Sequence, residues 1–262
     1  MNGLGAYWQG LIVGYYDFRN FWSLRSWLFG WMLRILSNSF AWVLMGRMLG
    51  SPEKQSYLLV GNAVAVGATS ALWASNASGW SRFDGTHPLM VIAPASLVPA
   101  TIGRTSIWLF NGIATSVASF SVLMLAFGYR PTLSQALLVL PLLVLVCISS
   151  YCFALFLGAM VGRRIRLRNL VLDVTGTLFM AWCGVSVPVS FWPGWIQFLV
   201  QMLPLSHGLT AIRGVLTDAP LRLVLRESVL ETSVGAAWLA ISLLLIDRVA
   251  ESGRRDGSIE LV

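Results

Sequence analysis

Charged side chains are what this sequence has least of. They make up 11% of its 262 residues, against roughly 25% in soluble domains. With a mean hydropathy of +0.73, the chain is too apolar for a water-soluble protein, and its polar loops are too short to form a second globular domain. The composition therefore predicts a single membrane domain over residues 1–262.

Cysteine, histidine and nucleotide-binding motifs are scarce or absent. The chain has three cysteines and two histidines, without a C-x-x-C pair or a Cys/His cluster, so we expect buried thiols and no metal site. No G-x-x-x-x-G-K-[ST] motif occurs, so ATP cannot be held by that route. No Ser, Cys or acidic residue has a motif that ties it to His207. We therefore expect neither catalytic residues nor a cofactor bound by this chain.

Long apolar runs take the place of those features. Most are long enough to cross ~30 Å of hydrocarbon, which needs roughly 20 helical residues. They lack the period-2 alternation of a barrel, so the sequence predicts an all-α membrane protein with six transmembrane helices. The six predicted spans are Trp27–Leu49, Tyr57–Ala77, Thr105–Phe127, Gln135–Val161, Leu170–Pro188 and Ser233–Ile246.

The distribution of Lys and Arg predicts the orientation. If the N-terminus is cytosolic and the spans alternate, eleven of the 18 basic residues lie inside and six outside, with Arg34 within span one. This bias predicts a multi-pass protein of the inner (cytoplasmic) cell membrane with both termini in the cytosol. Anionic membrane lipids account for the net charge of +7 without a nucleic-acid partner. The first ten residues contain no Lys or Arg, so no signal peptide is expected.

An amphipathic segment precedes the first span. Its apolar residues recur at steps of four and three, which predicts an interfacial helix over residues 4–25. Such a helix fixes the angle of span one or acts as a lever that meets a cytosolic partner, and the two roles are compatible. The recurring residues are Leu4, Trp8, Leu11, Tyr15, Phe18 and Trp22.

Three polar side chains fall inside or beside the predicted spans. Arg34 and Asn38 lie one turn apart on one helical face. Arg34 either faces a cavity or snorkels to the cytosolic surface, whereas the deeper Asn38 suits a cavity wall or a helix–helix hydrogen bond. Asp173 can pair with the arginines at 163–168. A proton relay through Asp173 would need a second carboxylate within the spans, and the sequence does not indicate one.

Two interruptions carry local helix signals. Ser81 and Asp84 form a capping-box-like start and Pro94 a stop, which predicts a short cytosolic helix over residues 81–94. Residues 191–216 predict two short apolar helices separated by Pro204. A helix over Pro193–Gln201 is only ~14 Å long, too short to cross, so the pair is expected to dip into the membrane and return.

These interruptions resemble the permease subunits of ABC-2 type exporters. The first interruption has the same motifs in the same order as that family: an acidic residue, Gly-Thr, a hydrophobic helix, Ala-Pro-x-Ser, and a Gly-Arg that opens span three. Here they are Asp84, Gly85, Thr86, Leu89, Ala93, Pro94, Ser96, Gly103 and Arg104. The re-entrant hairpin of the family is matched by Pro193, Trp195, Pro204, Leu205, Leu209 and Arg213. The chain departs from the family at two points. Arg82 and Phe83 precede Asp84, so a single acid stands before the Gly-Thr where the family often has more. His87 and Pro88 follow the Gly-Thr, where a longer helical run is common.

The resemblance implies partners. Residues 81–94 would be the coupling helix that docks into a cytosolic ABC ATPase, which binds the ATP and Mg²⁺. An ordinary cytosolic loop is the alternative. A second permease copy or a paralogous permease would complete the transporter. The implied ATPase contacts are Arg82, Phe83, Asp84, Gly85, Thr86, Leu89, Met90 and Pro94.

The function implied is export of an amphipathic or lipid-like small molecule, such as a drug or natural product. A glycan or lipopolysaccharide-type exporter and an ion-coupled transporter are the alternatives. A pore is disfavoured because spans three and four are so apolar. Residues expected to line the substrate path, each of which plain packing or lipid contact also explains, are Asn38, Met45, Asn62, Trp73, Phe179 and Trp182.

Overall fold

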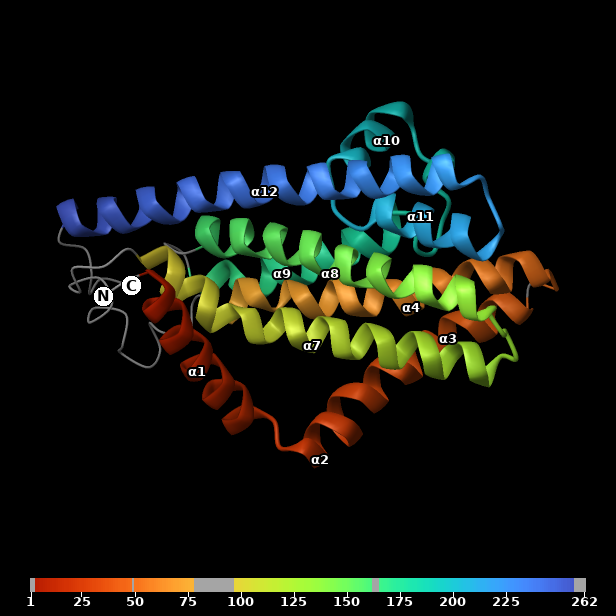
Figure 1. Ribbon diagram of the computed structural model, residues 1–262, viewed down its shortest axis with the longest axis horizontal. Helices are drawn as coiled ribbons and strands as arrows, with labels where there is room; N and C mark the ends of the chain where they lie inside the picture. The colour runs from red at the N-terminus through yellow and green to blue at the C-terminus, as the bar shows by residue number, and fades with distance from the viewer. Residues whose placement is uncertain (1–2, 49, 78–96, 162–164, 257–262) are drawn as a thin grey trace.

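The computed structural model describes residues 3–48, 50–77, 97–161 and 165–256. Those ranges contain helices and no strands, which confirms the predicted all-α class. The long helices lie along one axis, with α1 and α3 forming a V beside them (Figure 1). The elements are α1 (Gly3–Phe21), α2 (Leu24–Ser26), the π-helix η1 (Trp27–Met32), α3 (Leu33–Met48), α4 (Pro52–Leu72), α7 (Leu97–Ala126), α8 (Leu133–Val161), the 3₁₀ turn η2 (Ile165–Leu167), α9 (Arg168–Trp182), the 3₁₀ turn η3 (Val189–Phe191), α10 (Gly194–Gln201), α11 (Ser206–Leu216) and α12 (Leu221–Asp256).

Five helical segments in the described ranges are long and apolar enough to cross a membrane. They are Leu24–Met48, Pro52–Ala77, Val98–Ala126, Leu133–Val161 and Leu221–Arg248. The predicted fifth span corresponds to α9, which has 15 residues and is about 22 Å long at 1.5 Å per residue. That is short of the ~30 Å hydrocarbon core. The described ranges thus contain five such helices, which indicates a membrane protein, and a sixth crossing stays a prediction.

The prediction of a span that continues to Pro188 is wrong beyond Trp182, where α9 ends. Gly184 has φ +80°, a conformation that a helix cannot continue through. Its carbonyl oxygen accepts hydrogen bonds from the Tyr57 hydroxyl at 2.7 Å and from Arg213 at 2.8 Å. Contacts with α4 and α11 therefore stop the helix.

The last helix is much longer than its apolar run. α12 has 36 residues, whereas hydropathy alone predicts only Ser233–Ile246. Its first three turns carry charges that would argue against a span, but the acids there have partners. Glu227 lies 2.7 Å from Nδ1 of His207, and Glu231 binds the start of α11. These tertiary contacts extend the helix toward Leu221.

Helix α4 is the centre of the bundle. It packs against α3, α7, α8 and α9, and most of its residues are buried. Its contact faces are made of small residues: a Cβ at Gly67 would overlap the Ser116 side chain on α7, and Gly112 of α7 lies against the Gly67 carbonyl. In hydrocarbon, such close backbone approach is a main source of helix association.

Helix α1 docks on α7 through glycine. Gly10 and Gly14 lie four residues apart and are buried, and a Cβ at either would overlap the backbone of Ala100 or Arg104. At the end of this contact Arg104 forms a 2.7 Å ion pair with Asp17. A helix therefore occupies most of the segment predicted to be interfacial, ending at Phe21, and its small-residue face holds it to α7. Its position at a membrane surface stays a prediction.

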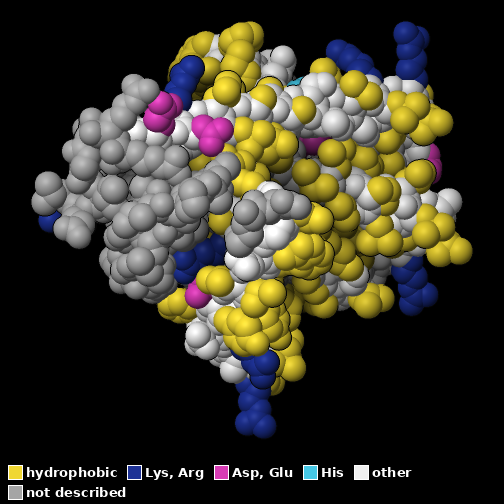
Figure 2. All heavy atoms as spheres, turned by 60° about the vertical axis from the view of Figure 1, so that its left-hand side comes forward, with side chains coloured by type: hydrophobic (Ala, Val, Ile, Leu, Met, Phe, Trp, Pro, Cys, Tyr) yellow, Lys and Arg dark blue, Asp and Glu magenta, His cyan; other side chains and the backbone are white. Residues whose placement is uncertain are grey.

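The predicted apolar stripe of α1 is divided between two environments. Leu4, Trp8 and Tyr15 are exposed, whereas Phe18 and Trp22 pack against the core. Figure 2 shows hydrophobic side chains over much of one face of the molecule, with the basic side chains gathered toward its edges. This distribution suits a molecule surrounded by lipid.

The hairpin predicted after span five contains the two expected short helices, α10 and α11. Glu231 of α12 is fully buried and accepts hydrogen bonds from the backbone N–H groups of Leu205 and Gly208, both at 2.9 Å. The Ser149 hydroxyl of α8 donates to the same carboxylate. A carboxylate at a helix N-terminus is favoured by the helix dipole, so Glu231 fastens α11 to α12 and α8.

Arg213 fastens the other end of α11. Its guanidinium lies 3.5 Å from the ring centroid of Tyr57 and donates to the backbone oxygens of Tyr57 and Gly184 at 3.0 and 2.8 Å. Pro204 is buried just before Leu205, whose φ is +87°. Pro193 directly precedes α10, and Trp195 is exposed.

Replacing Gly14 with valine should detach α1 from α7. The added side chain would overlap the Arg104 carbonyl, and overpacking of this kind costs about 1–3 kcal/mol. We expect a lower melting temperature in mild detergent and faster proteolysis between α1 and α2. Val13→Leu, at an exposed neighbouring position, should behave as wild type. Equal stability of the two variants would contradict the packing described.

Replacing Glu231 with alanine should release the hairpin. Three donors would lose a buried acceptor, and each hydrogen bond to a charged group contributes about 1.5–3 kcal/mol. We expect a large drop in melting temperature and new protease cleavage near residues 202–206. Thr232→Val, which removes an exposed hydroxyl next to it, serves as the control and should change neither.

Candidate functional site

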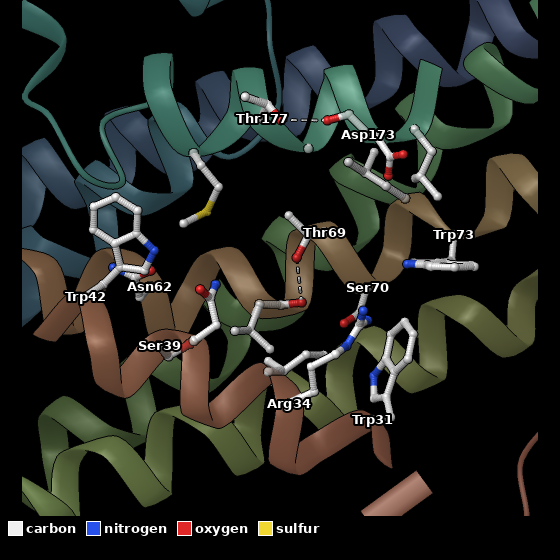
Figure 3. A pocket seen from close by; sticks show the side chains of 17 residues that line it. Trp31, Arg34, Ser39, Trp42, Asn62, Thr69, Ser70, Trp73, Asp173 and Thr177 are labelled. Atoms are coloured by element: carbon white, nitrogen blue, oxygen red, sulfur yellow. Dashed lines mark hydrogen bonds between the residues drawn. The ribbon is translucent and has the colours of Figure 1, made fainter. Parts of the chain in front are cut away.

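An open groove lies between α3, α4 and α9. Its volume is about 750 Å³, and its walls come from η1 and α3 on one side, α4 at the back and α9 on the other side. Figure 3 shows Arg34 and Trp31 on one wall, Thr69 and Ser70 on α4 with Trp73 in the turn after it, and Asp173 and Thr177 opposite. The groove brings several polar side chains together within the apolar bundle.

One cation and one anion face this groove. Arg34 and Asp173 are both exposed in it, and within the described ranges neither forms an ion pair. The Arg34 guanidinium lies 5.4 Å from the ring centroid of Trp31, a cation–π contact. Intramembrane charges without partners usually line a water-filled cavity or a substrate path. The charges fit a ligand that carries polar groups at both ends.

Uncharged polar groups continue the lining. The Thr69 and Thr177 hydroxyls donate to backbone oxygens one turn earlier, both at 2.8 Å, so their lone pairs remain for a ligand. Asn62 donates to the Leu58 carbonyl at 2.9 Å. Ser70 Oγ and Trp31 Nε1 are buried and have no hydrogen-bond partner among the residues that the structure describes. These two donors could serve a ligand or water in the groove.

Tryptophan forms the apolar part of the site. Trp31 and Trp73 meet edge to face, with ring centroids 5.4 Å apart, and Trp73 stacks on the buried Trp108 of α7 at 5.6 Å. Trp42 lines the groove one turn beyond Asn38. The π-helix η1 carries Trp31, and π-helical turns occur mostly where a helix is adapted to function.

Three of the six residues predicted to line a substrate path border this groove. Asn38, Asn62 and Trp73 do so from α3 and from α4 and the turn that follows it. The other three do not line it. Met45 is exposed on α3, Phe179 is fully buried and stacks on Phe153 at 6.0 Å, and Trp182 is half-buried at the end of α9.

Several lining residues were not singled out as path residues by the sequence. A periodicity could have found Arg34 and Trp42, because they recur with the predicted Asn38 every four residues on one face of α3. On α9, Asp173 and Thr177 have the same spacing. Each pattern is short and lies in a strongly apolar run, so it stands out only when the two helices are placed opposite each other.

Other predicted sites are placed differently. The ATPase-coupling residues Arg82, Phe83, Asp84, Gly85, Thr86, Leu89, Met90 and Pro94 lie outside the described residues. So do Arg163 and Arg164. Gly103 and Arg104, the predicted opening of span three, lie in α7 where α1 crosses it. Among the residues that the structure describes, no three His, Cys, Asp or Glu side chains form a group that could hold a metal ion.

Comparison with known proteins does not assign the chain. No protein-family model matches it, and no curated protein matches it significantly. The groove must therefore be interpreted from its own chemistry.

Thiol labelling should show that the groove is wet. The native Cys147, Cys152 and Cys183 are buried, so wild type should react little with a negatively charged methanethiosulfonate. Asn38→Cys and Thr177→Cys, on the two walls, should react at least about tenfold faster than Leu44→Cys, because a thiolate forms only in water. Leu44 is also exposed but lies outside the groove. Equal rates at Asn38→Cys and Leu44→Cys would mean that lipid fills the groove.

Proposed function

We propose that this chain is the permease subunit of an ATP-driven ABC exporter that moves an amphipathic or lipid-like small molecule out across the cell membrane. The observation that carries the proposal is the groove between α3, α4 and α9. It combines tryptophan faces, one cation, one anion and several hydroxyl and amide groups within an apolar helical bundle. Its volume of about 750 Å³ is in the range typical of small-molecule sites.

A groove open on one side favours a second permease. Asn38, Asp173 and Thr177 are exposed, and polar groups at that depth are costly against lipid. A second copy of this chain, or a paralogous permease, would face the groove and enclose the path between them, as in transporters with sites at a repeat interface.

The energy source is proposed to be a separate ABC ATPase. The sequence has no motif of its own for ATP phosphates, and residues 81–94 resemble the coupling helix of ABC-2 permeases. ATP and Mg²⁺ would bind the partner. The end of the bundle where α1 begins and α12 ends (Figure 1) would face the cytosol, in agreement with the cytosolic termini predicted from the distribution of Lys and Arg.

Two other functions have some support in the groove. Trp31, Trp42 and Trp73 with the amides of Asn38 and Asn62 also suit a sugar, which favours a glycan exporter as second candidate. Asp173 in the groove is the feature that favours ion coupling. Glu231 is a buried carboxylate that the sequence did not indicate, but its oxygens are occupied by two backbone N–H groups and Ser149.

Purification of the chain from its native membrane in mild detergent tests the class. We expect a stoichiometric partner that carries a Walker A motif. In vesicles containing that complex, Arg34→Gln and Asp173→Asn should each lower cargo-stimulated ATPase activity by about tenfold, because each removes a charge that faces the cargo. Arg47→Gln, at an exposed position of α3 outside the groove, is the matched control and should keep full stimulation.

A partner-free oligomer whose transport follows an imposed proton gradient would overturn the ABC proposal in favour of ion coupling. Asp84→Arg should abolish stimulation of the ATPase while the chain still inserts and folds. A variant that fails to insert or fold instead would count against a docking role for residues 81–94.

A further inference from the structure

A second crevice lies between the hairpin and α12, apart from the groove. It has a volume of about 820 Å³ and shares no lining residue with the groove. The α12 side chains that line it recur every three or four residues from Arg226 to Ile241. These positions are about 22 Å apart along the helix, close to the thickness of one leaflet of a ~40–45 Å bilayer.

The crevice is polar at one end and apolar at the other. Arg226, Glu227, Ser206 and His207 line the end near the start of α12. Toward the far end, the lining is formed by Ala237, Trp238 and Ile241, with Phe198 and Met202 from α10 and the turn after it. Gln201, Thr210 and Ser233 also line the crevice, but its charged residues on α12, Arg226 and Glu227, are confined to one end. The crevice therefore resembles one lipid leaflet, with charge at the headgroup end and apolar side chains at the acyl end.

The polar end has a free cation and an unused donor. Glu227 is engaged by His207 at 2.7 Å, whereas Arg226 is exposed and makes no ion pair with any residue that the structure describes. Ser206 is only 8% exposed; its hydroxyl lies next to the Cys183 thiol, a weak hydrogen-bonding group, and makes no geometrically defined hydrogen bond with any described residue. A phosphate matches the guanidinium, and an ester carbonyl matches the buried hydroxyl.

The apolar end offers a continuous wall. The Trp238 ring is fixed by Phe156, at 4.5 Å between ring centroids, and its Nε1 donates to the Met202 carbonyl at 2.8 Å. The indole polar group is thus satisfied within the protein, and the ring surface that borders the crevice is apolar. A single acyl chain fits this wall.

We propose that this crevice binds one anionic phospholipid, with its phosphate at Arg226, its ester group at Ser206 and one acyl chain along α12 as far as Ile241. The bound lipid fills the space between α10–α11 and α12. Glu231 and Arg213 hold the two ends of α11, and the lipid supports the hairpin along the crevice beside α12. The proposal does not depend on what the groove transports.

Two pairs of neighbouring residues on α12 provide matched variants. Ala237 and Ala236 are both exposed, but only Ala237 lines the crevice; Arg226 and Arg222 are both exposed, but only Arg226 lines it. Native mass spectrometry of the full-length chain, titrated with dioleoylphosphatidylglycerol, should show one tightly held lipid per chain. Arg226→Gln and Ala237→Trp should weaken its binding about tenfold, and Arg222→Gln and Ala236→Trp by less than twofold.

Control ligands identify which part of the lipid is recognised. Dioleoylglycerol, which lacks the phosphate, should bind at least tenfold more weakly to wild type and equally to Arg226→Gln. Displacement of the lipid by millimolar inorganic phosphate would overturn the proposal in favour of a free-phosphate site. The proposal would also be overturned if Arg226→Gln bound the lipid as tightly as Arg222→Gln does, and Ala237→Trp as tightly as Ala236→Trp. If Ala237→Trp does not fold, the arginine pair still decides the outcome.

Discussion

The close approach of helix backbones around α4 is the constraint on which the rest of the structure depends. Lipid tails are as apolar as the helices, so the hydrophobic effect does little to bring the helices together. Gly61 of α4 lies against the backbone of Val185, in the segment after α9. Gly67 of α4 lies against the Ser116 side chain of α7, and Gly112 of α7 lies against the backbone of α4. With α4 fixed from behind, α3 and α9 flank its remaining face, and the groove is the space between them.

Charged side chains inside the bundle fall into two groups. Glu231 and Arg213 have their polar atoms engaged largely by backbone groups, and they hold α11 from both ends. Arg34 and Asp173 have no ion-pair partner among the described residues and face open space. Because a buried polar group must be satisfied, the first pair explains how the hairpin is held. The second pair requires water, a ligand or another protein.

Hydropathy predicted the long helices because it depends only on consecutive apolar residues. It failed at α9 and at the start of α12, where distant contacts decide the outcome. Gly184 ends α9 under the influence of Tyr57 and Arg213, and Glu231 is accommodated by backbone N–H groups 26 and 23 residues earlier in the chain. Such partners cannot be identified from one sequence.

The groove was predicted in part for a similar reason. Asn38 and Asn62 stand out as amides in apolar runs, so the sequence pointed to them directly. Phe179 was a candidate for its size, but a large aromatic serves a packed core equally well, and it stacks on Phe153. The alternatives for Arg34 could be separated only after α9 was placed opposite it. The coupling residues at 82–94 remain a prediction from family resemblance.

The contact between α1 and α7 makes a mechanical unit of the two helices. The backbones of the two helices approach closely at Gly10 and Gly14, and the Asp17–Arg104 ion pair and the Phe18–Trp108 ring contact restrain sliding along the contact. α1 continues through α2 into η1, which carries Trp31 at the edge of the groove. We therefore expect a tilt imposed on the N-terminal end of α7 to be transmitted through α1 to the Trp31 wall. The width of the groove is coupled in this way to the position of a helix that does not line it.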